Sequence, residues 1–82
     1  MSVARRLVIR ERVVPDQERT GYEASVRAWE RMAKAASAHF WVFEHISERG
    51  RFVEFVEAAD DAALHAVLGD LPSDRWTEFQ GG

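Results

Sequence analysis

The sequence has no cysteine among its 82 residues, so it contains neither a disulfide bridge nor a thiolate metal site. It has only two prolines and five glycines, and none of the glycines belongs to a phosphate-binding or dinucleotide-binding pattern. No stretch approaches the roughly 18 apolar residues of a membrane span. The first residues include two arginines but lack the apolar run of a signal peptide. We therefore expect a cytoplasmic protein without a membrane anchor.

A surplus of positive charge is also missing. The chain has 14 acidic and 11 basic residues, which gives a net charge of −3. Proteins that bind nucleic acids usually carry a basic balance or patch, because contacts to phosphate supply much of their affinity. The overall charge therefore disfavours a nucleic-acid partner, although the arginines near the N-terminus form a local basic cluster.

The length of the chain indicates one domain over residues 1–82. A chain of this size buries only about 60–65% of the surface that its unfolded form exposes. Small domains without disulfides or structural metals often gain their missing stability by association. The composition therefore points to an oligomer.

Hydrophobic periodicity and turn residues divide the chain into six elements. We expect strands over residues 3–14, 38–46, 51–58 and 75–79, and helices over residues 20–37 and 60–68. Thr20 and Glu23 match a capping box for the first helix, with Asp16 as a rival cap, and Asp60 or Asp61 caps the second. The order βαββαβ is typical of a ferredoxin-like α+β domain, in which two helices cover one face of an antiparallel sheet.

The second predicted strand is apolar on both faces. One face carries His39, Trp41, Phe43 and His45, and the other carries Phe40, Val42, Glu44 and Ile46. An antiparallel sheet with one solvated face normally alternates between apolar and polar residues, and an exposed aromatic patch usually marks an interaction site. We therefore expect one face to pack on the helices and the other, open face to meet a partner.

The aliphatic residues suggest which face is which. Val42, Ile46, Val53 and Phe55 suit the helices, with Leu7 and Ile9 beside them. The open face would then carry three groups of residues: Arg6, Arg10 and Arg12; His39, Trp41, Phe43 and His45; and Phe52, Glu54 and Val56.

This assignment assumes a four-residue hairpin loop that pairs Phe43 with Glu54. A three-residue loop with a bulge at Gly50 would instead turn Val53, Phe55 and Glu57 to the open face. Glu11 fits poorly among the apolar residues of the first strand, so it either forms an ion pair or signals that the faces are reversed.

A mixture of arginines, histidines, a carboxylate and aromatic rings is typical of a pocket floor or of a polar-lined dimer interface. The candidate ligand-binding residues are Arg10, Arg12, His39, Trp41, Phe43, His45 and Glu54. No catalytic residue stands out, although histidine is the natural proton carrier near neutral pH. His39 and His45 are about 20 Å apart along a strand, so they cannot hold one metal ion within a single chain. No metal and no cofactor is predicted.

The segment from Glu57 to His65, EAADDAALH, together with the size and order of elements, resembles the dimeric α+β-barrel superfamily, which includes antibiotic-biosynthesis monooxygenase-like proteins. This resemblance implies a homodimer whose two sheets face each other and enclose a small cavity. It also implies a small aromatic or hydrophobic ligand, and in some members cofactor-free oxygenation. The chain has no asparagine, a residue that several of the oxygenases use in the pocket.

A second resemblance is to RNA-recognition domains, which share the βαββαβ order. Arg49 to Phe55, RGRFVEF, is similar to the motif of their third strand, but the position that normally supplies a stacking ring is missing. Glu54 would also repel phosphate. The stretch is better interpreted as a turn followed by a strand. Three hypotheses remain: a ligand-binding or monooxygenase-like homodimer, an assembly module without catalysis, and an RNA-binding domain.

Overall fold

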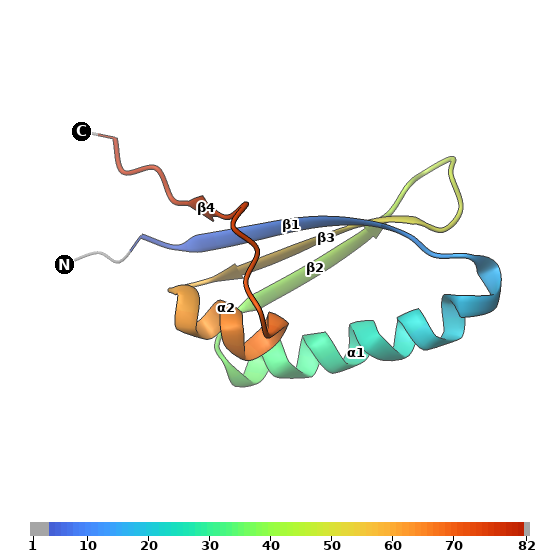
Figure 1. The fold of residues 1–82 in the computed structure, drawn as a ribbon, viewed down its shortest axis with the longest axis horizontal. Helices are drawn as coiled ribbons and strands as arrows, with labels where there is room; N and C mark the ends of the chain where they lie inside the picture. Colours follow the sequence, from blue (N-terminus) through green and yellow to red (C-terminus); the bar gives the residue numbers. More distant parts are fainter. Residues whose placement is uncertain (1–3, 82) are drawn as a thin grey trace.

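The computed structural model describes residues 4–81, in which four strands and two helices form an α+β fold (Figure 1). Its elements are β1 (Arg6–Val13), the 3-10 turn η1 (Asp16–Glu18), α1 (Arg19–Ala35), β2 (His39–Glu44), β3 (Arg51–Ala58), α2 (Asp61–Leu68) and β4 (Trp76–Thr77). The strands form one antiparallel sheet in the order β2-β3-β1-β4. The predicted α+β class is confirmed. The predicted start of the first strand, at Val3, lies outside the described residues.

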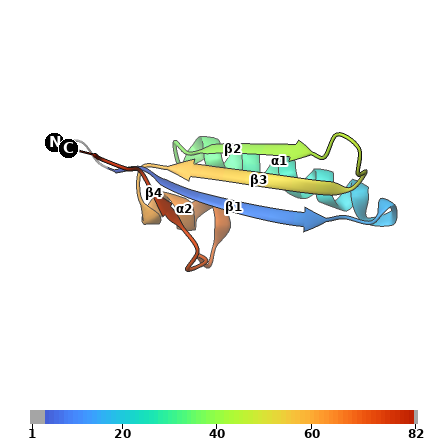
Figure 2. The same ribbon diagram turned by 90° about the horizontal axis from the view of Figure 1, so that it is seen from above.

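Both helices lie on the same side of the sheet, and the other side is open (Figures 1 and 2). At a rise of about 1.5 Å per residue, the eight residues of α2 span about 12 Å, whereas the eight residues of β1 or β3 span about 26 Å. The 17-residue helix α1 runs along the whole sheet. Two helices therefore cover one half of the sheet, and α1 alone covers the other.

The hydrophobic core lies in the half that both helices cover. Its buried residues are Val8, Ala33, Val56, Ala58, Leu64 and Val67. They come from α1, α2 and the two central strands, and every side chain among them is small or aliphatic. The other half of the layer between sheet and helix holds polar and aromatic groups instead.

The hairpin between β2 and β3 has neither of the two predicted loops, but it turns β3 as the alternative predicted. Phe43 pairs with Val53, not with Glu54. The amide of His45 donates to the carbonyl of Arg51 over 2.7 Å. This one-residue shift exchanges the two faces of β3, so Val53 and Phe55 lie on the open face, and the buried face of β3 carries Phe52, Glu54 and Val56.

The predicted faces of β1 are also reversed. Arg10 pairs with Glu54 and Ile9 pairs with Phe55. Arg10 and Arg12 therefore face the helices, as does the core residue Val8, whereas Leu7 and Ile9 face outward. Glu11, which fitted poorly on the predicted helix side, lies on the open face, where its carboxylate is 3.5 Å from Arg51. The prediction was wrong because it assumed that aliphatic residues mark the helix side, whereas arginine stems can pack beneath a helix when their charge is paired.

The helix caps follow the prediction in part. The Asp60 carboxylate accepts the amide of Ala63 over 2.9 Å and caps α2. The capping box of Thr20 and Glu23 does not form, because the turn η1 starts the helix earlier. The amide of Glu18 already donates to the carbonyl of Pro15 over 2.9 Å.

Gly50 joins the hairpin to the end of β1. Its amide donates to the Glu44 carboxylate over 2.8 Å, and its carbonyl accepts the amide of Val14 over 2.7 Å. Its φ of +86° is a conformation that other residues rarely adopt. An added Cβ would lie 2.5 Å from the carbonyl oxygen of Val14, so no side chain fits.

We predict that Gly50→Ala lowers the free energy of unfolding by about 1–3 kcal/mol, the usual cost of a non-glycine residue held at positive φ. The matched control is Gly21→Ala, because a Cβ at Gly21 meets no atom within 4 Å and lies in helix α1. This control should raise stability by up to about 1 kcal/mol. Urea unfolding followed by circular dichroism measures both changes, and equal stabilities for the two variants would contradict the geometry at Gly50.

Candidate functional site

The open face of the sheet is apolar at its centre. The apolar side chains of this centre come from all four strands and are Leu7, Ile9, Trp41, Phe43, Val53, Phe55 and Trp76. Trp41 is 49% exposed and Phe43 is 57% exposed. The ring of Phe43 meets the ring of Phe55 edge to face, with centroids 5.9 Å apart. The face therefore presents aromatic side chains to whatever covers it.

Ion pairs lie at both ends of the open face. At one end Arg5 binds the Glu57 carboxylate, and His39 Nδ1 is 3.9 Å from the same carboxylate. At the other end Arg51 is 3.5 Å from Glu11. The arginines on this face are thus paired with carboxylates, and the centre between them is free of charge.

The structure divides the predicted ligand-binding residues among three places. His39, Trp41 and Phe43 lie on the open face, as expected. His45 lies just beyond β2, where its Nδ1 accepts the amides of Ser47 and Glu48 at 3.2 and 3.1 Å. The remaining three residues lie on the opposite, helix-covered face, which corrects their predicted position; they are Arg10, Arg12 and Glu54.

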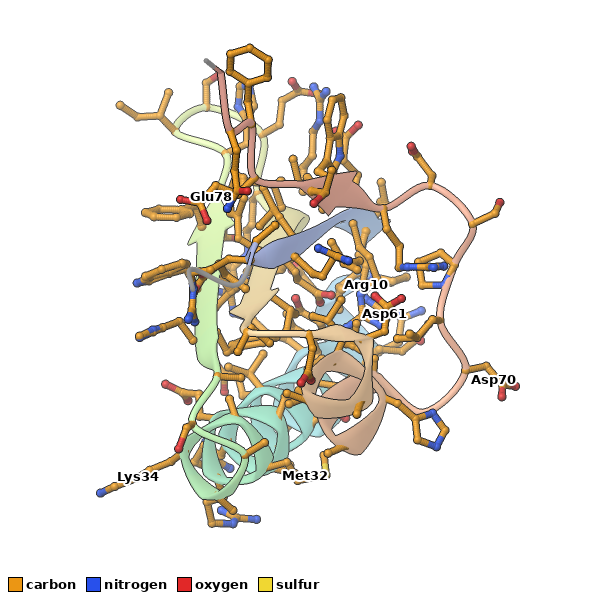
Figure 3. The ribbon with its side chains drawn as sticks, turned by 90° about the vertical axis from the view of Figure 1, so that its left-hand side faces the viewer. Arg10, Met32, Lys34, Asp61, Asp70 and Glu78 are labelled. Carbon is orange, nitrogen blue, oxygen red and sulfur yellow. The ribbon has the colours of Figure 1, made fainter. Side chains whose placement is uncertain are left out.

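Glu54 is the centre of a buried polar cluster between the sheet and α1. Its side chain has no exposed surface. One carboxylate oxygen accepts Arg10 Nε over 2.8 Å. The other accepts the hydroxyl of Tyr22 over 2.5 Å and lies 2.9 Å from Arg12 Nε. Figure 3 shows Arg10 in the layer between the sheet and the helices.

Aromatic rings of α1 complete the cluster. The guanidinium groups of Arg10 and Arg12 lie over the ring of Trp29, at 5.0 and 5.2 Å from its centroid. The ring of Tyr22 packs edge to face on Trp29 and also contacts Phe52. Such cation–π contacts add stability when the cation is partly removed from water. The arginines therefore have both a carboxylate and an aromatic partner.

Burial and the hydrogen bond to Glu54 both raise the pKa of Tyr22 above its ordinary value. Desolvation is the larger cause, because a phenolate would lose its water, and the negative charge of Glu54 adds to it. The Tyr22 hydroxyl therefore stays protonated and acts as a hydrogen-bond donor, not as a base.

Tyr22 and Trp29 recur at helical spacing, which predicts that they lie in an apolar stripe of α1 and gives no sign of their polar partners. The available signal was a glutamate in the middle of an apolar strand, opposite a strand that carries Arg6, Arg10 and Arg12 on one face. This pattern predicts cross-strand ion pairs. The pattern does not show on which side of the sheet the ion pairs lie, because both sides carry apolar residues that must be buried.

A cleft of about 750 Å³ borders this cluster where β1 runs into η1 and α1. It is lined by Arg12, Val13, Val14, Gln17, Glu18, Gly21, Tyr22 and Ser25. The cleft exists because α2 ends before this half of the sheet and β4 pairs only with Arg6 and Leu7. Nothing else in residues 4–81 covers the space beneath the end of β1.

An ion pair between Arg19 and Glu44 connects the start of α1 to the hairpin. Arg19 donates through both terminal nitrogens to the Glu44 carboxylate, each over 2.8 Å. These bonds, together with the amide of Gly50, lower the pKa of Glu44 to about 2. The same pairing raises the pKa of Arg19.

Comparisons with protein-family models, with curated proteins and with solved structures gave no significant match. Within residues 4–81 there is no group of three or more His, Asp or Glu side chains placed to hold a metal ion. In the same range no helix has the length and apolar character to cross a membrane. Any functional inference therefore depends on the open face and on the cluster around Glu54.

We predict that Glu54→Gln lowers the free energy of unfolding by about 3–5 kcal/mol, because it leaves two arginines without their buried counter-charge. The control is Glu11→Gln on the neighbouring strand, whose exposed ion pair should contribute less than about 1 kcal/mol. Urea unfolding at neutral pH compares them. Equal losses of stability would show that Glu54 is not buried among the arginines.

The ion pair of Glu44 predicts a pH dependence. Its folded pKa of about 2 lies below its ordinary value of 4.5, so its stabilising contribution is complete above pH 4.5 and is lost as the pH falls towards 2. Glu44→Gln should be less stable than the wild type at neutral pH, and the difference should shrink across this range. Exposed Glu30→Gln serves as the control. A difference that stays constant from pH 6 to about 2 would contradict the assignment.

Proposed function

We propose that this chain is a ferredoxin-like domain that forms a homodimer through the open face of its sheet, in the arrangement of a dimeric α+β barrel. The observation that carries this proposal is the uncovered apolar centre of that face, with Trp41 and Phe43 about half exposed. Exposed aromatic patches of this kind mark interaction sites. The core of this small domain consists of a few aliphatic residues, so covering the aromatic side chains of the open face would add to its stability.

The charges on the open face favour a second copy as the occupant. A two-fold interface brings a surface against itself, so a face of one sign would repel its partner. Here Arg5 and Arg51 are balanced by Glu57 and Glu11. Anionic surfaces such as RNA or lipid headgroups are less suitable, because the cations on this face already have carboxylate partners and the chain has a net charge of −3.

The same face could hold a small aromatic or hydrophobic ligand once two sheets meet. In one chain the hollows at its two ends measure about 130 and 240 Å³, below the about 300 Å³ at which ligand pockets usually begin. A ligand pocket or a monooxygenase-like site on this face therefore needs walls from the second copy. Assembly is the primary proposal, and ligand binding between the sheets depends on it.

We predict that light scattering gives the wild type a mass of twice 9.4 kDa and gives Trp41→Glu a mass close to 9.4 kDa. A carboxylate at the centre of the interface would have to be buried without a partner, which is costly. Because Trp41 is half exposed in the single chain, the variant should keep its circular dichroism spectrum.

The matched control is Met32→Glu, which makes the same kind of change on α1, on the other side of the molecule (Figure 3). It should remain a dimer. A monomeric wild type at high micromolar concentration would overturn the proposal and would make a different protein or RNA the partner to seek. A Trp41→Glu dimer would place the interface elsewhere.

A further inference from the structure

The cleft beside the Glu54 cluster is separate from the open face, since it lies on the helix side of the sheet. We propose that it binds a small organic monocarboxylate, with Arg12 as the residue that holds the carboxylate group.

The cluster has one more positive charge than negative charge. Arg10 and Arg12 share the single carboxylate of Glu54. Both arginines are partly exposed, so water meets part of this excess charge, and a bound carboxylate would replace that water as the counter-charge. Cation–π contacts with Trp29 compensate in part. Arg10 already meets Glu54 through Nε and one terminal nitrogen, so the spare donors of the cluster belong mainly to Arg12.

Arg12 belongs both to the cluster and to the lining of the cleft. It meets Glu54 through Nε, so its two terminal nitrogens remain for another acceptor. The side chain is 39% exposed, and it lines the cleft. A guanidinium edge with two parallel N–H groups is the donor arrangement that binds a carboxylate in a bidentate manner.

The rest of the lining fits an organic body better than an inorganic anion. Val13 and Val14 supply an apolar wall, and Gly21 leaves room where a side chain would project from α1. Ser25 and Gln17 add neutral polar groups. Glu18 also borders the cleft, so a multiply charged anion would be repelled, whereas a monocarboxylate can turn its uncharged end towards it.

Titration with benzoate, followed by amide NMR spectra of the wild type, tests this proposal. Benzoate should give saturable shifts at the amides of the cleft residues from β1 and α1. Benzamide has the same shape without the charge and should bind at least about tenfold more weakly, as expected for a lost charge-assisted hydrogen bond. Saturable binding of inorganic phosphate as tight as that of benzoate would overturn the assignment of an organic ligand, and no saturable benzoate shift would overturn the site.

Two variants locate the site. Arg12→Gln should weaken benzoate binding by at least about tenfold, whereas Arg27→Gln, which changes an exposed arginine of α1 outside the cleft, should not. Gly21→Leu places a side chain in the cleft without removing any group of the cluster, and its new Cβ meets no atom within 4 Å, so it should fold and lose benzoate binding. Unchanged binding in Gly21→Leu would contradict the proposal, even if Arg12→Gln proved unstable.

The site is independent of the proposed dimer. Trp41→Glu should bind benzoate as the wild type does, because Trp41 lies on the opposite face of the sheet. Loss of benzoate binding in Trp41→Glu, with folding retained, would place the ligand at the open face instead.

Discussion

The buried carboxylate of Glu54 constrains the structure more than any other single group. It has no contact with water, so it must be met by donors from its surroundings, and these come from the neighbouring strand and from the helix above it. Satisfying it fixes Arg10 and Arg12 on the helix side of β1 and holds Tyr22 of α1 against β3. Because strand side chains alternate, the same interaction sends Ile9 and Leu7 to the open face. One interaction thus decides what both faces of the sheet present.

The two candidate sites arise from one mismatch of lengths. Helix α2 is too short to cover the sheet beyond the aliphatic core, so the far half of the helix side is closed by α1 with polar and aromatic groups. That half contains the Glu54 cluster and the adjoining cleft. The open side has no helix at all, and its aromatic centre is bordered by ion pairs. The proposed dimer and the proposed carboxylate site therefore use opposite sides of the same sheet.

The order and type of the elements could be predicted because each has a local signal. The apolar alternation, the helical stripe, Asp60 before α2 and Gly50 in the hairpin all act over a few residues. β3 was predicted with its observed bounds, Arg51–Ala58. The faces were not predictable in this way. The faces depend on a one-residue choice of register. They also depend on the pairing of Glu54 with Arg10, which lie 44 residues apart in the chain. The sequence placed His39, Trp41 and Phe43 together correctly, because alternation within β2 separates its two faces whatever the hairpin register is.

Arg10 and Arg12 of β1 face α1, whereas Leu7 and Ile9 face the open side. The most direct measurement is a set of nuclear Overhauser effects from the Arg12 Nε proton and from the methyl groups of Ile9. The structure predicts contacts from Arg12 to the rings of Trp29 and Tyr22, and from Ile9 to Phe55 across the open face. Contacts from the Ile9 methyl groups to Trp29, with Arg12 free of aromatic neighbours, would contradict the account and reverse the two faces.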